Sequence, residues 1–182
     1  FYFDDEAGKT RFIGLSTFGL FLKDSYESHY TKEQLEWFNN KALDVKEGWI
    51  IVVFTHALYA IVTPTDELSV TPTGAKEFID AIDNYKGKGT IVCVLIGHSH
   101  RDRIHMGSTG IPYIISACDR HSTYQGDINV ERVPNTVSEQ HFEVVIIDKV
   151  KRQIELLSVG ANARDGYDND PGLETDVRTV KY

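Results

Sequence analysis

Residues 91–100 read IVCVLIGHSH, and this stretch decides how the rest of the chain can be arranged. Its first six residues are apolar and show no polar alternation, which predicts a strand that is buried on both faces. Gly97 allows a sharp turn where this strand ends. His98 and His100 are two positions apart, so in an extended segment both imidazoles leave the backbone on the same side. Two such imidazoles can bind one metal ion or serve two adjacent ions.

An earlier apolar run ends in the same way. Residues 49–54 read WIIVVF, and Thr55 and His56 follow them. A single histidine at a strand end is usually a hydrogen-bonded loop residue. His56 therefore indicates a metal ligand only in combination with His98 and His100. Ligands of open α/β sheets bind outside the carboxyl ends of the strands. If the two strands are parallel neighbours, we expect His56, His98 and His100 to converge on one metal site.

These residues resemble the motifs of a known family. Gly97-His98-Ser99-His100 is similar to the Gly-His-x-His signature of the calcineurin-like metallophosphoesterases, and Thr55-His56-Ala57 is similar to the isolated strand-end histidine that precedes it. The resemblance implies an α/β fold, a β-sandwich flanked by helices (αββα), of which this chain is the C-terminal half. It places residues 1–160 in the phosphoesterase domain and residues 161–182 in a polar C-terminal tail.

The chain also departs from the family pattern. The family carries Asp-x-His, Gly-Asp and Gly-Asn-His motifs before the isolated histidine, and residues 1–55 contain none of them. The one Gly-Asp pair, Gly126-Asp127, follows the signature. We therefore expect these motifs upstream of Phe1 in an intact protein, together with the bridging carboxylate and the proton-donating histidine. No catalytic residue is assigned within this chain, which alone is expected to bind metal weakly and to hydrolyse nothing.

The family resemblance implies a function for the intact protein. Two divalent metal ions, drawn from Mn, Fe, Zn or Ni, would bind a phosphate-ester substrate and activate a hydroxide that attacks phosphorus. By analogy, His56 and His98 would bind one ion and His100 the other. The charged residues after the signature could orient these imidazoles, contact the phosphate, or form an ion pair in a solvated loop; they are Arg101, Asp102 and Arg103.

Two other functions fit the same residues. A mononuclear zinc hydrolase would use His56, His98 and His100 with water as the fourth ligand. A phosphoesterase-like scaffold that has lost its metals would instead bind a protein partner. One tightly bound zinc ion per chain would favour the first alternative, and an upstream sequence without the Asp-x-His and Asn-His motifs would favour the second.

Composition limits the partners of the chain. The net charge of -8 and the isoelectric point near 5.3 argue against a nucleic-acid or anionic-membrane surface. No apolar run reaches about 18 residues, so we expect no membrane span. We also expect a soluble protein, with the cytoplasm as the favoured location. Cys93 lies within an apolar run and reads as a core residue. A sheet edge left open by a missing half would allow two copies to associate.

Periodicity predicts the remaining elements. We expect a hairpin over residues 1–16, a helix over 31–43 capped by Thr31 with Gln34, and a helix over 72–85. His105 is expected in a strand. Alternating patterns over 142–148 and 153–159 predict a second hairpin with one half-exposed face.

Overall fold

The computed structural model describes residues 1–17, 29–58, 73–98, 103–116, 133–136, 139–160 and 175–182. The chain divides into two compact units. One unit spans Phe1–His98 and His105–Tyr113, and the other spans Ser99–Ile104 and Ile114–Tyr182. Of the three predicted histidine ligands, the structure describes His56 and His98. Both belong to the first unit.

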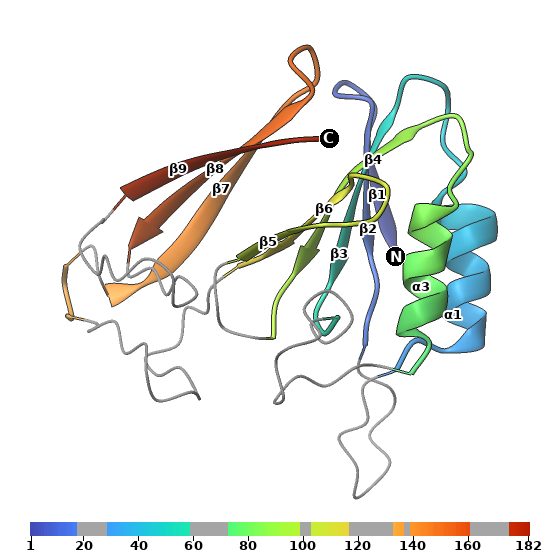
Figure 1. Cartoon of the computed structure of the whole chain (residues 1–182), viewed down its shortest axis with the longest axis horizontal. Helices are drawn as coiled ribbons and strands as arrows, with labels where there is room; N and C mark the ends of the chain where they lie inside the picture. The colour runs from blue at the N-terminus through green and yellow to red at the C-terminus, as the bar shows by residue number, and fades with distance from the viewer. Residues whose placement is uncertain (18–28, 59–72, 99–102, 117–132, 137–138, 161–174) are drawn as a thin grey trace, which may run out of the picture. The chain divides into compact units, whose positions relative to one another are not determined.

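The larger sheet has six strands in the spatial order β1-β2-β3-β4-β6-β5 (Figure 1). Strands β1 and β2 form the antiparallel hairpin predicted near the start of the chain, whereas β2, β3 and β4 are parallel neighbours. The predicted parallel pairing of the two apolar runs is therefore confirmed. The strands are β1 (Tyr2–Asp5), β2 (Thr10–Gly14), β3 (Ile50–Thr55), β4 (Thr90–Ile96), β5 (Arg103–Met106) and β6 (Pro112–Ile115).

Strands β3 and β4 are buried on both faces. Consecutive residues of a strand point to opposite faces, yet Ile51, Val52 and Val53 are each at most 1% exposed. In β4, Val92 and Cys93 are also fully buried. This burial explains why both runs are apolar without alternation, as parallel strands covered on each side require. Polar groups can appear only where such strands end.

Helices cover one face of this sheet (Figure 1). Helix α1 (Lys32–Trp37) is capped as predicted, since the Thr31 hydroxyl accepts a hydrogen bond from the Gln34 amide at 3.2 Å. It continues as the π-helix η1 (Phe38–Ala42), in which the Leu43 amide bonds to the carbonyl of Phe38, five residues earlier, at 3.0 Å.

The second helix begins later than the sequence predicted. We expected it from residue 72, but α3 spans Ala75–Asp83. Gly74 has a φ of +80°, a left-handed conformation through which a right-handed helix cannot extend towards the N-terminus. The Thr73 carbonyl accepts a hydrogen bond from the Tyr30 amide at 2.8 Å. Thr73 is therefore drawn into a bridge with His29 and cannot start the helix. Along α3, Phe78 and Ile82 are buried, which confirms the predicted apolar face.

A buried arginine joins the first hairpin to the end of η1. Arg11 is 8% exposed and forms a bidentate pair with Asp4, at 2.6 and 2.7 Å. Its third nitrogen donates to the carbonyls of Ala42 at 3.1 Å and Asp44 at 2.9 Å. The hydrogen bonds from Arg11 lower the pKa of the Asp4 carboxyl from its usual value. The carbonyls at the helix end, which lack helical partners, thus accept hydrogen bonds from the Arg11 guanidinium. The Asp4 carboxylate balances its charge.

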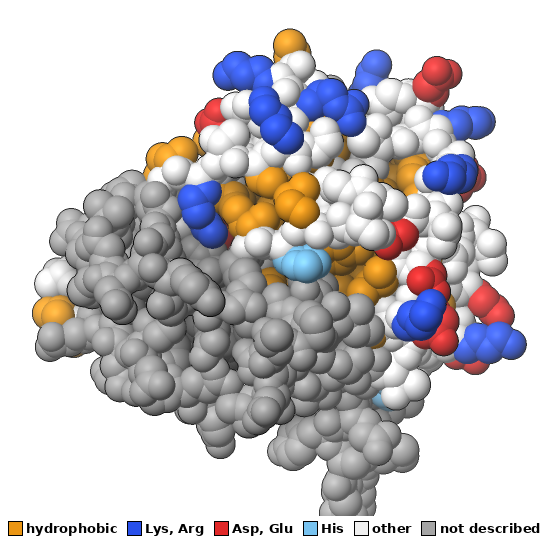
Figure 2. Space-filling model, viewed as in Figure 1, with side chains coloured by type: hydrophobic (Ala, Val, Ile, Leu, Met, Phe, Trp, Pro, Cys, Tyr) orange, Lys and Arg blue, Asp and Glu red, His pale blue; other side chains and the backbone are white. Residues whose placement is uncertain are grey.

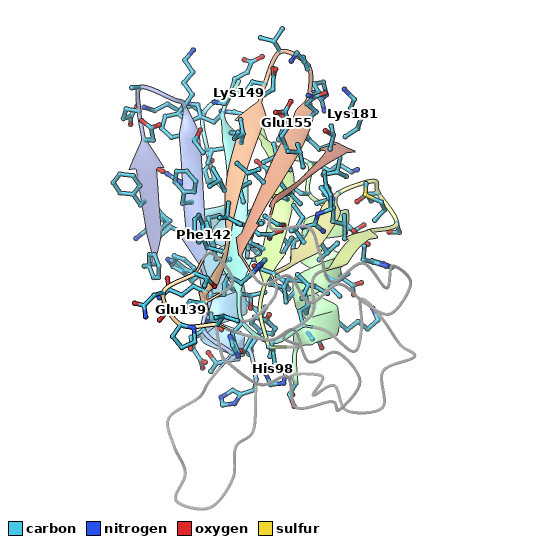
Figure 3. All side chains as sticks on the ribbon, turned by 90° about the vertical axis from the view of Figure 1, so that its left-hand side faces the viewer. His98, Glu139, Phe142, Lys149, Glu155 and Lys181 are labelled. Atoms are coloured by element: carbon cyan, nitrogen blue, oxygen red, sulfur yellow. The ribbon has the colours of Figure 1, made fainter. Side chains whose placement is uncertain are left out.

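The second sheet has three antiparallel strands in the order β7-β8-β9. They are β7 (His141–Asp148), β8 (Gln153–Gly160) and β9 (Thr175–Lys181). The hairpin of β7 and β8 confirms the prediction for that stretch, and β9 lies within the segment that the sequence assigned to the tail. One row of β8 is buried, including Ile154 and Leu156, whereas Phe142 on β7 is 52% exposed and labelled in Figure 3.

The described part of the chain is thus a mixed α/β structure with two sheets and few helices, which confirms the predicted class. Acidic and basic side chains are interspersed over the surface that Figure 2 draws in colour. Some of them pair along helices, as Lys32 with Glu36 and Lys76 with Asp80 do. Among the helices within the described ranges, none has the length and apolar character needed to cross a membrane.

Candidate metal centre

Two neighbouring strand ends bring His56 and His98 together. The β3–β4 pairing reaches Thr55 opposite Ile96. Past that pair, the Gly97 amide donates to the carbonyl of His56 at 3.1 Å, so the two chains stay joined for one more residue. His98 follows directly. Gly97 also leaves room for the neighbouring ring, because a Cβ at this position would lie 3.2 Å from Nδ1 of His56.

The two imidazoles face each other at this edge. Nε2 of His56 lies 3.3 Å from Nδ1 of His98, and the rings are nearly perpendicular, with an angle of 79° between their planes. Figure 3 shows His98 projecting past the ends of the strands. Two nitrogen ligands of one tetrahedral ion, each about 2.05 Å from the metal, are themselves about 3.3 Å apart. The two rings are within hydrogen-bonding distance, and the same separation fits two ligands of a single ion.

The backbone at His98 is strained. Its φ is +72°, in the left-handed region that residues with a Cβ seldom adopt, although histidine enters it more often than most. Such a conformation costs about 1–2 kcal/mol and persists only where surrounding contacts hold it. Here it turns the chain so that the His98 ring lies against His56. Strained backbone conformations of this kind cluster at functional sites.

A buried hydroxyl pair holds the residue before His56. The Tyr30 hydroxyl and Oγ1 of Thr55 are 2.6 Å apart, and Tyr30 is 3% exposed and stacks on Phe78 with ring centroids 4.8 Å apart. Burial raises the pKa of the Tyr30 hydroxyl, so it stays protonated and keeps its capacity to donate. Thr55 is thereby anchored on the helix-covered side. This positions the backbone from which His56 projects.

The sequence did not identify Tyr30 or Thr55 as part of this arrangement. Tyr30 lies among other aromatic and polar residues before α1, and no motif separates it from them. The only available signal was that a threonine, a polar residue, ends an otherwise apolar strand. A buried hydroxyl at that place must find a partner, and only the fold shows that the partner is Tyr30.

A pocket of about 550 Å³ opens beside His56. Its walls come from the carboxyl ends of β2, β3 and β4, within the first unit. They include Gly14, Phe54, Leu95 and Gly97, and the surface that these residues present is mostly apolar. The site therefore combines an imidazole pair with an adjoining apolar wall.

The other predicted site residues are only partly accounted for. His100, Arg101 and Asp102 lie outside the described ranges, and Arg103 is the first residue of β5. Within the ranges that the structure describes, no group of three or more His, Cys, Asp or Glu side chains is placed to hold a metal ion. His56 and His98 thus form a pair, and the role of all three histidines as metal ligands stays a prediction.

Comparisons with known proteins add little to this geometry. No family model matches the chain, and no curated protein matches it in sequence. Among solved structures, a single mutant of Vps29 from Entamoeba histolytica is similar, with 9% sequence identity and a TM-score of 0.32. The match covers 94% of this chain and 98% of that one.

Proposed function

We propose that this chain contributes His56, His98 and His100 to a divalent-metal site that hydrolyses phosphate esters in the intact protein. The observation that supports the proposal best is the 3.3 Å separation of the His56 and His98 nitrogens at the carboxyl edge of parallel strands. That edge is where α/β sheets bind their ligands. His98 also holds a strained backbone conformation that brings its ring to His56.

Each histidine has a distinct part in this proposal. His56 and His98 would hold one ion, since their nitrogens have the separation of ligands that share a metal. His100 would hold a second ion. When bound, such ions supply Lewis acidity and a strong nucleophile near neutral pH. Arg101 or Arg103 would contact the phosphate oxygens, and Asp102 would accept a hydrogen bond from an imidazole and orient it.

Metal binding by the chain alone tests the proposal. Mn²⁺ and Zn²⁺ would be titrated into the 182-residue chain and followed by calorimetry, with His98→Ala and His56→Ala as variants. We expect weak binding that falls about tenfold or more in either variant, because each removes one ligand. His105→Ala is the matched control, since His105 lies in β5 and not in the pair.

Three outcomes separate the alternatives. Binding that is the same in the wild type and in both ligand variants would contradict the metal site and favour the scaffold. One tightly bound zinc ion per chain, with hydrolysis of 4-nitrophenyl phosphate, would favour the mononuclear zinc hydrolase. We expect no turnover of that ester with added Mn²⁺, and turnover that His98→Ala removes would contradict the expectation that this chain is inactive by itself.

A further inference from the structure

The pocket beside His56 has a feature that the metal site does not require. Phe54 is 40% exposed, although Val52 and Val53 on the same strand are almost completely buried. Its neighbours across the sheet are Gly14 on β2 and Leu95 on β4. A partly exposed aromatic ring thus lies near the end of an otherwise buried strand, two residues before an imidazole that we place at the metal.

The absence of a side chain on Gly14 makes room for a second ring, that of Phe1, beside Phe54. Gly14 lies opposite Phe54 in the parallel register, and a Cβ at Gly14 would come within 2.6 Å of the Phe1 ring. The Phe1 ring therefore lies over Gly14 and forms part of the pocket wall beside Phe54. Phe12, two residues before Gly14 on the same strand, lies against Phe54 with ring centroids 6.2 Å apart. Phe54 thus contacts a neighbouring ring and stays partly exposed.

We propose that this pocket binds a planar aromatic group of an anionic ester whose phosphate lies at His56 and His98. The placement of the phosphate rests on the proposed function, whereas the aromatic subsite rests on the pocket alone. The volume of about 550 Å³ is within the range of about 300–1,000 Å³ that small-molecule sites occupy. Such sites combine apolar walls with a few polar groups at one end, as this one does.

The walls favour an aromatic group over an alkyl chain. A planar ring can contact the Phe1 and Phe54 rings of the pocket wall in an offset or edge-to-face arrangement. An alkyl chain buries apolar area at the same place but lacks the ring–ring contact. Leu95 completes the wall from β4 and adds area without further selectivity.

Two phosphonates that differ only in the organic group test the subsite. Phenylphosphonate and methylphosphonate cannot be hydrolysed at the carbon–phosphorus bond, so their dissociation constants can be measured by calorimetry with Mn²⁺ present. We expect phenylphosphonate to bind about tenfold more tightly. In Phe54→Leu, which keeps an apolar side chain without the ring, this preference should fall about threefold while methylphosphonate binding is unchanged.

A matched variant and a smaller probe complete the design. Phe142→Leu removes an exposed phenylalanine from a strand of the other sheet and should leave both dissociation constants unchanged. Phenol, added without metal, should shift the amide resonances of Gly14 and Gly97 in the wild type but much less in Phe54→Leu. Circular dichroism would confirm that both variants fold.

The results distinguish this inference from the metal-site proposal. If neither phosphonate binds but phenol still shifts Gly14 and Gly97 through Phe54, the aromatic subsite stands and the phosphate position is wrong. If methylphosphonate binds with metal as tightly as phenylphosphonate and phenol shifts neither amide, the subsite is overturned and the metal site remains. A phenyl preference that Phe142→Leu reduces as much as Phe54→Leu does would also overturn it.

Discussion

The two sheets use apolar residues in different ways, and the difference shows where chemistry can be placed. In β3, residues on both faces are buried, so polar side chains are confined to the ends of the strand. In β7 and β8, burial alternates, and the exposed row of β7 carries Phe142, Val144 and Ile146. In the first arrangement, functional side chains can lie only at the ends of the strands. In the second, a broad apolar face is exposed, and any role of that face depends on what it contacts outside the sheet.

The largest expected effect tests this alternation in β8. Leu156 is completely buried and Leu157, the next residue, points to the half-exposed face. Leu156→Ala should lower the free energy of unfolding by about 3 kcal/mol, because it removes buried methyl groups and leaves a cavity. Leu157→Ala should cost about 1 kcal/mol. Urea unfolding followed by circular dichroism measures both.

The corresponding pair in β3 provides the contrast. Val52 and Val53 are 1% and 0% exposed, so Val52→Ala and Val53→Ala should each cost about 2 kcal/mol. Tryptophan fluorescence reports this unit, since both tryptophans, Trp37 and Trp49, lie within it. Unequal costs in β3, or equal costs at Leu156 and Leu157, would contradict the difference between the two sheets.

A smaller effect is expected at the ion pair of the first hairpin. Because Arg11 lowers the pKa of Asp4 in the folded state, this pair stabilises the protein above the unfolded pKa of Asp4, and the stabilisation is lost as pH falls through the lower folded pKa. Asp4→Asn should therefore cost about 1–2 kcal/mol at pH 7, with the charge-assisted hydrogen bonds weakened. The difference from the wild type should shrink below about pH 4.

Urea unfolding of both proteins from pH 7 to pH 3 measures this dependence. Lys32→Gln is a suitable control, since Lys32 forms an exposed ion pair with Glu36 at 3.7 Å. Pairs of that kind contribute about 0–1 kcal/mol. A constant difference between Asp4→Asn and the wild type down to pH 3 would show that the charge of Asp4 is not what stabilises the hairpin.

The smallest effect compares two residues with left-handed backbones, one in each unit. His98 has a φ of +72° at the site, and Arg152 has a φ of +51° in the turn between β7 and β8. His98→Gly should raise the free energy of unfolding by about 1 kcal/mol, since glycine adopts this conformation without strain. Arg152→Gly should gain less, because Arg152 also donates to the Tyr182 carbonyl at 3.3 Å.

Function should respond differently from stability in this comparison. His98→Gly is expected to weaken Mn²⁺ binding, measured by calorimetry, whereas Arg152→Gly should leave it unchanged. A gain in stability together with a loss of metal binding would show that the strain at His98 serves the site. If both substitutions leave metal binding unchanged, His98 is not a ligand and its conformation has another cause.

Self-association through a sheet edge stays a prediction. Strands β7 and β9 are the outer strands of their sheet, and β7 carries an exposed apolar row along its length. Edges of this kind can pair with another chain. The cytoplasmic location, the two divalent metal ions and the phosphate-ester substrate likewise stay predictions from the sequence.

Much of the fold followed from local pattern. The apolar runs predicted β3 and β4, the Thr31 and Gln34 spacing predicted the start of α1, and alternation predicted β7 and β8. These succeed because each signal comes from residues close in sequence, which share a strand face or a helix end. The strand-end rule then predicted that His56 and His98 would be neighbours, although 42 positions separate them.

Other features depend on contacts between distant segments. The guanidinium of Arg11, a residue of the first hairpin, is buried at the end of η1. The later start of α3 depends on a hydrogen bond from Tyr30 to Thr73. No local pattern encodes either partner, because each bond joins residues about 30 or more positions apart in the chain.

By itself, the sequence determined the α/β class, the parallel pairing of two wholly apolar strands, and the edge where their histidines emerge, because hydrophobic periodicity dictates which faces must leave water. Only the tertiary structure decided the 3.3 Å separation of the imidazoles, the left-handed turn at His98, and the open aromatic pocket beside Phe54. These depend on register, backbone angles and the packing over Gly14, and such quantities are set when strands from different parts of the chain pack together.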